Sequence, residues 1–554
     1  MADRELSARA ILLGLVLGVP IAAGNVYAGL KLGVADAGGT AIILIAFALF
    51  GAGKRRFSPR ETVVSQVSGS SAASMALTAG LVGPIPALAM SGRTMAPVVV
   101  VLWGCALAVF GSLFAIPFRR TFIEVKKLAF PSARAAGEVI TKLFAGGEER
   151  ERGAVWMLVG TGAAAAAFTF ARDQLQWVPA AWFLPLAVSG VPAVALLVGI
   201  NASPLVVGVG VLVGARVGVS MLAGAALAWL VVAPALVQRG IAGASYPELV
   251  SWTLWPGAAL MVAASLAGLL FSARDVVRAW RSGGEATQPW VKPALLLSAL
   301  AIVAIGWLGF SVHPLHALLA VALGAAFSLA GMQATGETDN TPSGPLGGLT
   351  QVVVGGLPPG GVGTPLHAGG VVNGAVTHSS QMVASWKTGE LVGSQPRRLL
   401  VAQLAGIATG AVAAAVAFWL VGQAYGIGTE AMPSPAAMSW KATADAVAGG
   451  TDSMPAGAPL AALAGALAGV LLTVGERSER LRRFLPSAVA IGIGFIVPAM
   501  IAFTLALSAI AFALVARRAP GWNQRNAPSL ASGLILGESF AGVIIAAIAV
   551  LSAA

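Results

Sequence analysis

One acidic residue, Glu538, lies inside the last long apolar stretch of the sequence, and no basic residue occurs within one helical turn of it. An ionised carboxylate at the centre of a lipid bilayer costs about 2.5–3.5 kcal/mol or more, so this residue must be neutral or paired. Burial favours the protonated form of a carboxyl group, which would suit a proton carrier. A structural hydrogen bond to a neighbouring helix is the alternative. Glu538 is therefore a candidate for proton coupling, and both interpretations stay open.

Polar residues are concentrated a second time between positions 344 and 384, where glycine and proline are also frequent. Both of these residue types disfavour an uninterrupted helix, so the composition predicts two short broken or re-entrant helices. Irregular backbone at membrane depth is tolerated only inside protein or beside water, which predicts that the segment lines a cavity. An extramembrane loop with ordinary turns is the alternative. The candidate binding residues of the segment are Gln351, Asn373, His378 and Gln381.

Asn25, Tyr27 and Lys31 lie at the end of the first apolar stretch. Positions 27 and 31 are four apart, which places them on one face of a helix. Lys31 could bind a ligand carboxylate, or its long side chain could extend to the membrane surface. We expect all three residues to contribute to a binding site.

Two further acidic residues are candidates for proton coupling. Glu61 begins an apolar stretch and lies five positions before Gln66, so both lie on neighbouring faces of one helix over more than one turn. Because Glu61 follows Arg60, a helix-terminal surface charge is the alternative, while Gln66 is a candidate binding residue. Glu337 and Asp339 precede the glycine-rich segment, where they could gate protons or ions or be ordinary loop charges.

Arg216 lies in the middle of the apolar stretch 204–236, among several glycines. An arginine at this depth must be paired or face water. Its planar guanidinium could bind a substrate carboxylate. The alternative, which we favour, is that 204–236 forms two short helices with Arg216 at their junction, because the stretch is longer than one span needs.

The composition indicates the elements that must position these residues. The chain has 554 residues, of which 57% are hydrophobic and only 10% are charged. Soluble domains carry about 25% charged residues, so most of the surface of this protein must face lipid. The net charge of +12 does not indicate nucleic-acid binding, because lysine and arginine are concentrated in short loops between apolar stretches.

The apolar stretches predict an all-α polytopic membrane protein with about fourteen full transmembrane helices of roughly 20 residues each. With the two short broken helices, the total is about sixteen elements. Although the first stretch could pass for a signal peptide, the many similar stretches that follow favour a transmembrane helix. The expected spans are 8–30, 38–53, 60–82, 94–117, 153–171, 179–199, 204–236, 255–272, 291–311, 314–333, 399–421, 459–475, 486–515 and 528–551.

Basic residues predict the orientation of these spans. With a cytoplasmic N-terminus, the basic loop 118–152 and the other basic clusters fall in the cytoplasm, whereas 422–458 forms an extracytoplasmic loop. Arg517 and Arg518 then fall on the outer side, unless 486–515 is not a simple span. We expect residues 1–554 to form a single transport domain. A Pro-Ser-Ala motif that occurs at 131–133 and again at 486–488 is compatible with an internal duplication.

No motif indicates a cofactor or a resident metal ion. Cys105 is the only cysteine, so an intrachain disulfide and a cysteine metal cluster are impossible. The four histidines lack the spacing of a zinc site. There is no phosphate-binding Gly-Lys-Ser/Thr motif and no paired catalytic motif, so we do not expect an enzyme.

Several motifs in a fixed order resemble those of the oligopeptide transporter family of the bacterial or archaeal type, which includes the yellow-stripe-like metal-chelate carriers. Two positions differ from the usual pattern: Thr62 stands where the family has Asn, and Val67 where it has Thr, so some of the polar contacts expected there are missing. The motifs lie at 25–33, 61–66, 127–138, 336–342, 349–351, 386–397 and 531–538.

The resemblance implies a secondary active importer of the cell or inner membrane that works by alternating access. It implies proton-driven uptake of small peptides or, as the alternative, of metal complexes with amino-acid-like chelators. A metal ion would then arrive inside its chelate. A passive channel is the alternative from another class, and a homo-oligomer is compatible with the resemblance.

Overall fold

A computed structural model describes residues 5–33, 35, 38–50, 57–144, 148–281, 288–339, 341–358, 361–450, 454–482 and 484–553. Among the basic residues that predict the orientation, Lys54, Arg55, Arg56 and Arg483 lie outside the described residues. The chain forms two compact units. Unit 1 comprises residues 1–26, 35–156 and 272–419, and unit 2 comprises residues 27–34, 157–271 and 420–554. Whether they form a single transport domain with duplicated halves stays a prediction.

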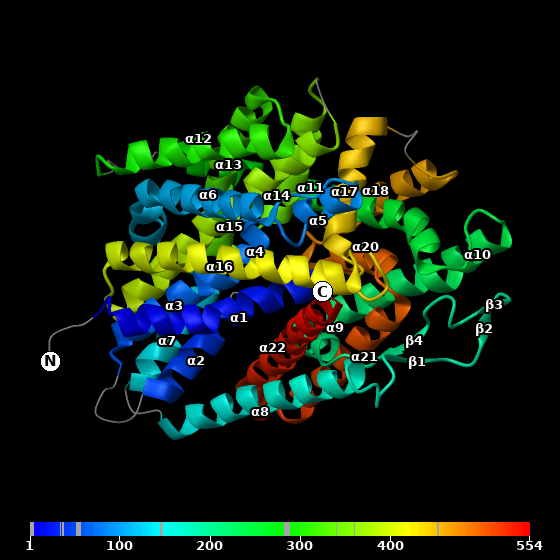
Figure 1. The fold of residues 1–554 in the computed structure, drawn as a ribbon, viewed down its shortest axis with the longest axis horizontal. Helices are drawn as coiled ribbons and strands as arrows, with labels where there is room; N and C mark the ends of the chain where they lie inside the picture. Colours follow the sequence, from blue (N-terminus) through cyan, green and yellow to red (C-terminus); the bar gives the residue numbers. More distant parts are fainter. Residues whose placement is uncertain are drawn as a thin grey trace. The chain divides into compact units, whose positions relative to one another are not determined.

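Unit 1 is built from helices, which Figure 1 labels in chain order. Helix α1 begins in unit 1, and its last six residues belong to unit 2. The elements of unit 1 are α1 (Ala8–Leu32), α2 (Gly39–Phe50), α3 (Pro59–Ala73), α4 (Met75–Thr78), α5 (Pro84–Met90), α6 (Pro97–Ala115), η1 (Ile116–Phe118), η2 (Thr121–Val125), α7 (Pro131–Phe144), α12 (Val291–Phe310), α13 (Pro314–Thr338), α14 (Ser343–Gly355), α15 (Gly363–Val392) and most of α16 (Pro396–Tyr425).

Unit 2 contains helices and four short strands. The strands pair antiparallel, β1 with β4 and β2 with β3 (Figure 1). The elements are most of α8 (Glu148–Asp173), β1 (Ala181–Phe183), β2 (Ala187–Val188), β3 (Val191–Pro192), β4 (Gly199–Asn201), α9 (Pro204–Ala226), η3 (Leu227–Val232), α10 (Ala233–Gln238), most of α11 (Tyr246–Arg281), α17 (Pro435–Gly449), α18 (Ala458–Gly475), α19 (Glu479–Arg482), α20 (Ala488–Ile496), α21 (Ala499–Arg518) and α22 (Pro520–Ala553).

The all-helical polytopic fold is confirmed. Among the described residues, 11 helices are long and apolar enough to cross a membrane. Two of the expected spans are shorter or divided: 38–53 contains only the 12-residue helix α2, and 60–82 contains α3 and α4 and ends before α5. The two expected loops contain helices as well, α7 within 118–152 and α17 within 422–458.

The expected span 179–199 is wrong, because this segment forms two nested antiparallel strand pairs instead of a helix. Strand β1 pairs with β4, with Trp182 opposite Ile200, and β2 pairs with β3. Pro185 and Pro192 interrupt the segment, and a proline inside a helix removes a hydrogen bond and clashes with the preceding turn. The apolar content alone did not separate paired strands from a membrane helix.

The segment 344–384 is predicted to form two short broken helices, and it does contain two helices, but only one of them is short. Helix α14 is short, and the chain is interrupted only between it and α15, which is a continuous helix of 30 residues. A backbone buried in an apolar environment keeps its helical hydrogen bonds despite glycine, because unpaired polar groups there cost several kcal/mol. The glycines permit close packing instead: a Cβ on Gly374 would lie 2.7 Å from the carbonyl oxygen of Thr78.

Two other apolar stretches are interrupted. The helix at 204–236 is kinked at Gly214, whose φ of 76° and ψ of 171° are not helical, and it continues as the π-helix η3 and then as α10. This confirms the interpretation that Arg216 lies near a junction. The stretch 486–515 is divided at Val497 and Pro498 into α20 and α21, so it is not a simple span.

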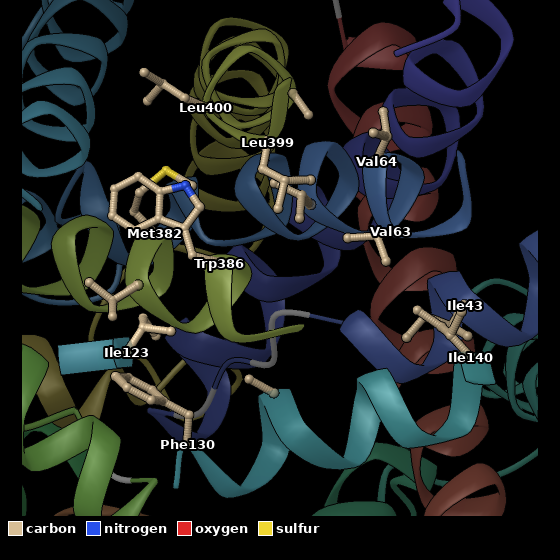
Figure 2. Packing of buried hydrophobic residues seen from close by; sticks show 14 of the residues in the cluster. Ile43, Val63, Val64, Ile123, Phe130, Ile140, Met382, Trp386, Leu399 and Leu400 are labelled. Carbon is tan, nitrogen blue, oxygen red and sulfur yellow. The ribbon is translucent and has the colours of Figure 1, made fainter. Parts of the chain in front are cut away.

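One apolar core of unit 1 surrounds the C-terminal half of α15. Met382 and Trp386 of α15 and Leu399 of α16 belong to one buried cluster, which also includes Val63 of α3 (Figure 2). Ile140 of α7 belongs to the same cluster, so α7 packs onto the unit through its apolar face. This core fixes α15 against α3.

Glycines bring the helices of unit 2 into close contact. Helix α22 lies beside α8 in Figure 1, and a Cβ added to Gly533 or Gly537 would overlap atoms of α8. On the side of α9, a Cβ on Gly208 would lie 2.8 Å from the carbonyl oxygen of Ala531. Small residues allow such close approach of membrane helices. This seam holds α8, α9 and α22 together around Glu538.

Candidate substrate-binding site

Unit 2 contains a partly open cavity of about 290 Å³ in which charged and aromatic side chains meet. Its wall combines both signs of charge with apolar surface. The lining residues are Tyr27, Lys31, Arg172, Asp173, Ala180, Asn201, Tyr425, Glu430, Ala431, Met432, Met500 and Ile501.

Glu538 is fully buried in α22 and does not itself line this cavity. Its Oε1 accepts hydrogen bonds from Lys31 Nζ at 2.7 Å and from Arg172 Nη2 at 3.3 Å. Its Oε2 accepts from Ser203 Oγ at 2.7 Å and from the backbone N–H of Leu205 at 2.8 Å. The last two donors belong to the N-terminus of α9, where the helix dipole favours a negative charge. Glu538 is therefore paired, as its position in an apolar stretch requires.

Arg172, at the end of α8, is held by several acceptors. Its Nε donates to Asp173 Oδ1 at 2.6 Å and its Nη2 to Asp173 Oδ2 at 2.8 Å, which makes the pair bidentate. Its Nη1 donates to the backbone carbonyl of Ala202. Together with the contact to Glu538, these bonds fix the guanidinium plane in the cavity wall.

Lys31 ends α1 and is 8% exposed. Its Nζ donates to Glu538 and, at 3.4 Å, to the hydroxyl of Tyr27, and it lies 5.3 Å from the centroid of the Tyr27 ring. The Tyr27 and Tyr425 rings meet edge to face with centroids 6.0 Å apart. An ammonium group has three N–H donors, so one donor of Lys31 remains for a ligand.

Glu430 belongs to the segment that connects α16 to α17, and it is exposed at the cavity. The segment is held by bonds from the Ser434 N–H to the Leu30 carbonyl at 2.7 Å and from the Gly428 N–H to the Met432 carbonyl at 2.9 Å. Partial burial raises the pKa of the Glu430 carboxyl. The cavity therefore has a carboxylate at its exposed part and two cations in its wall.

Three of the residues predicted from the sequence, Tyr27, Lys31 and Glu538, come together at this cavity. Arg216 does not join them. Its Nη2 contacts Glu476, its Nε donates to the Leu485 carbonyl at 3.1 Å, and both bonds are exposed. The arginine is paired, as its depth requires, but with a carboxylate away from the cavity lining.

Other predicted residues bond to the region around α4 within unit 1. Asn25 Nδ2 donates to the Ala73 carbonyl at 2.9 Å, and Asn373 Nδ2 donates to the Leu77 carbonyl at 2.9 Å. The buried ring of His378 bonds to Thr78 Oγ1 at 2.7 Å and to Ser71 Oγ at 3.4 Å. These bonds tie α1 and α15 to the region around the short helix α4.

The three glutamines predicted as binding residues retain unused hydrogen-bonding groups within the part of the chain that the structure describes. Gln66 Nε2 donates to Ser70 Oγ at 3.3 Å, but Gln66 Oε1 has no partner there. Gln351 Oε1 and both amide atoms of Gln381 also lack a partner among the described residues. These groups could still take a ligand, and their role as binding residues stays a prediction.

The other two predicted coupling residues have structural partners in unit 1. Glu61 is buried at the N-terminus of α3, where it forms a capping box with Ser58 and pairs with Arg9 at 2.7 Å. Glu337 is exposed near the C-terminus of α13 and contacts Gln333 Nε2. Their role in proton coupling stays a prediction.

Four charged or aromatic lining residues were not predicted from the sequence: Arg172, Asp173, Tyr425 and Glu430. The only sequence signal for the first two is an Arg-Asp pair directly after an apolar stretch, a pattern that is also typical of the end of a span. Among the described residues, no group of three or more His, Cys, Asp or Glu side chains is arranged to hold a metal ion.

The long apolar helices define a polytopic membrane protein, and unit 2 contains a charged cavity. A family model described as "OPT oligopeptide transporter protein" matches residues 5–549, which is nearly the whole chain. The chain therefore belongs to the OPT oligopeptide transporter family, as the sequence motifs predicted.

Individual relatives carry two kinds of name. "Probable metal-nicotianamine transporter YSL8" of Oryza sativa subsp. japonica is 28% identical over 253 residues, which cover 44% of this chain and 36% of the rice protein. "Probable metal-nicotianamine transporter YSL17" of the same organism is 30% identical over 263 residues, covering 45% and 38%. "Putative oligopeptide transporter YGL114W" of Saccharomyces cerevisiae is 23% identical over 723 residues, covering 98% and 96%. The match thus spans little more than a third of either rice protein.

Proposed function

We propose that the protein is a secondary active, proton-coupled importer of small peptides that works by alternating access. Family membership supports transport, and the cavity of unit 2 is the observation that carries the choice of substrate. It exposes cations and carboxylates within one space of about 290 Å³. A small peptide at neutral pH is a zwitterion, so its two ends match this wall. The proposal includes a cytoplasmic N-terminus, a location in the cell or inner membrane and a homo-oligomer.

The carboxylate of the peptide binds Lys31 in this proposal. The lysine lines the cavity and retains one N–H donor after its bonds to Glu538 and Tyr27. Arg172 supplies a second positive charge but already donates from all three guanidinium nitrogens. Lys31 is thus the anchor, and Arg172 contributes mainly through its charge.

Glu538 couples binding to a proton in this proposal. A carboxylate that binds Lys31 competes with Glu538 for the same ammonium group. A buried carboxylate that loses a cation is driven towards its neutral form, so a proton enters as the substrate does. The charges of the site agree with this step. The site has two cations, Lys31 and Arg172, and three carboxylates, Glu538, Asp173 and Glu430. A bound zwitterion adds no net charge, so the occupied site lacks one positive charge, which a proton would supply.

The test is uptake of labelled dipeptides into proteoliposomes at several external pH values. The wild type should accumulate peptide against a gradient and do so faster at acidic external pH. Glu538→Gln, which keeps the shape of the side chain but cannot change its charge, should lose the acid stimulation. Glu124→Gln, an exposed residue away from the cavity, is the matched control. A normal pH profile in Glu538→Gln would exclude this coupling role.

Import of metal–chelate complexes is the second candidate, and the printed names of the two rice relatives favour it. Such a complex also carries carboxylates and amino groups, so the same cavity would suit it without a metal site on the protein. Competition of peptide uptake by metal chelates distinguishes the two candidates. Counterflow distinguishes both from a passive channel, because only a carrier exchanges labelled substrate against a gradient.

A further inference from the structure

We propose that Glu430 forms the subsite for the free ammonium group of the substrate, so that the protein selects ligands with an unblocked amino end. This inference rests on the proposed function, in which the substrate carboxylate binds Lys31. It places the opposite, amino end of the substrate at Glu430. The ligand class is a zwitterion with a primary ammonium group.

The position of Glu430 is the first argument. Glu430, Ala431 and Met432 line the cavity from the segment between α16 and α17. This segment is not a free loop, because Ser434 bonds to the end of α1 and Gly428 bonds across to Met432. A ligand that fills the cavity therefore meets the Glu430 carboxylate in a defined place.

The second argument is charge. Every other charged side chain in the cavity wall has an opposite partner: Arg172 pairs with Asp173, and Lys31 pairs with Glu538. Glu430 has no salt-bridge partner among the residues that the structure describes. A ligand that covers this carboxylate displaces the water that solvates it, which is unfavourable unless the ligand supplies a positive charge.

The third argument is the chemistry of the ligand. An ammonium group donates charge-assisted hydrogen bonds to a carboxylate, and such bonds are about twice as strong as neutral ones. Tyr425 lines the same cavity and adds an aromatic group, a type of side chain that attracts cations. An acetylated amino end has no charge and only one donor, so it should bind roughly tenfold less tightly.

The experiment measures dipeptide uptake by the full-length protein in proteoliposomes. A dipeptide with a free amino end and its N-acetyl derivative are compared in the wild type and in Glu430→Gln, with Glu124→Gln as the control. The wild type and the control should prefer the free dipeptide by about tenfold. Glu430→Gln should lose most of this preference through a higher KM for the free dipeptide, with the KM of the acetylated one unchanged. Glu430→Asp, which restores the charge, should recover part of the preference.

The outcomes separate the inference from the function on which it rests. If Glu430→Gln keeps the full preference of the wild type, Glu430 is not the ammonium subsite, and the proposed importer stands. If the wild type transports both dipeptides equally well, there is no such subsite. If the wild type accumulates neither dipeptide, the proposed peptide import is wrong, and this inference is overturned with it.

Discussion

Two buried carboxylates of the molecule differ in a way that bears on function. Glu61 in unit 1 begins α3, where it caps the helix and pairs with Arg9, whose side chain is 36% exposed. Glu538 in unit 2 lies inside α22 and pairs with Lys31 and Arg172, whose side chains are 9% and 4% exposed. Both acids are satisfied, and the partners of Glu538 line the cavity of unit 2.

This difference shows that the burial of an acidic residue is a weak indicator of function. The side chains that pair with the acidic residue are a better indicator. A carboxylate in the first turn of a helix bonds to free N–H groups that every helix has. A carboxylate inside a helix has no such local reason for its position. The free-energy cost of burying such a carboxylate is offset by cations from other helices. A ligand that binds those cations weakens this compensation.

The largest expected effect is that of Glu538→Ala. Removing one partner of a buried ion pair leaves Lys31 without its carboxylate, which should lower the free energy of unfolding by about 3–5 kcal/mol. Thermal unfolding in detergent measures the loss. Combining Glu538→Gln with Lys31→Met should destabilise less than the sum of the single changes, because no unpaired charge is left. Additive effects would show that the two side chains do not interact.

Glu61→Gln should have a smaller effect. Loss of the charge weakens the pair with Arg9 and the reciprocal bond to Ser58, so we expect a loss of about 1–2 kcal/mol of unfolding free energy. Uptake and its pH dependence should stay close to the wild type if the role of this carboxyl is structural. Loss of acid stimulation in Glu61→Gln would instead support the coupling role that its sequence context predicts.

Thr78→Val tests the neutral polar contacts of unit 1. Valine keeps the shape of threonine but removes the hydroxyl that bonds to His378 at 2.7 Å. The buried ring loses its closest partner, which should lower the free energy of unfolding by about 1 kcal/mol. The value comes from chemical denaturation of the wild type and the variant side by side. An unchanged stability would mean that water or another group replaces the hydroxyl.

The smallest expected effect is a dependence of stability on the charge of Glu430. The pKa of the Glu430 carboxyl is raised, which means that folding favours its protonated form. The protonated carboxyl therefore contributes to stability fully below the ordinary pKa of about 4.3. This contribution is lost as the pH rises through the raised pKa of the folded protein. Lys31, Arg172 and Asp173 line the same cavity, and Tyr246 interacts electrostatically with Glu430. Relative to Glu430→Gln, the wild type should therefore melt at a slightly lower temperature as the pH rises from 4 to 7.

The sequence predicted the fold class and the main helices well, because a membrane span depends on a local property, its apolar length. The pairing of Glu538 could be predicted only in general form. The cost of a lone charge implies a partner, but Lys31 and Arg172 lie 507 and 366 positions away in the chain. Such long-range contacts depend on helix packing that no local pattern describes.

The wrong predictions have a common physical cause. Apolar content shows that a segment avoids water, and it does not show what buries the segment. The segment 181–201 is largely apolar but forms paired strands, and the glycine-rich helix α15 is continuous and closely packed at Gly374. Glu430 could not be predicted from the sequence, because acidic residues are common in polar loops. Only the structure shows that this one lines a cavity.

The glycines at which α22 packs against α8 limit the mutations that the gene can tolerate. Any missense change at Gly533 or Gly537 adds at least a Cβ atom, and that atom would overlap α8. A single-base change in a glycine codon can be silent, can create a stop codon or can replace glycine. In the last case the new residue always carries a Cβ atom. These codons should therefore tolerate only silent changes, and a mutational scan should find them nearly as intolerant as the codon for Glu538.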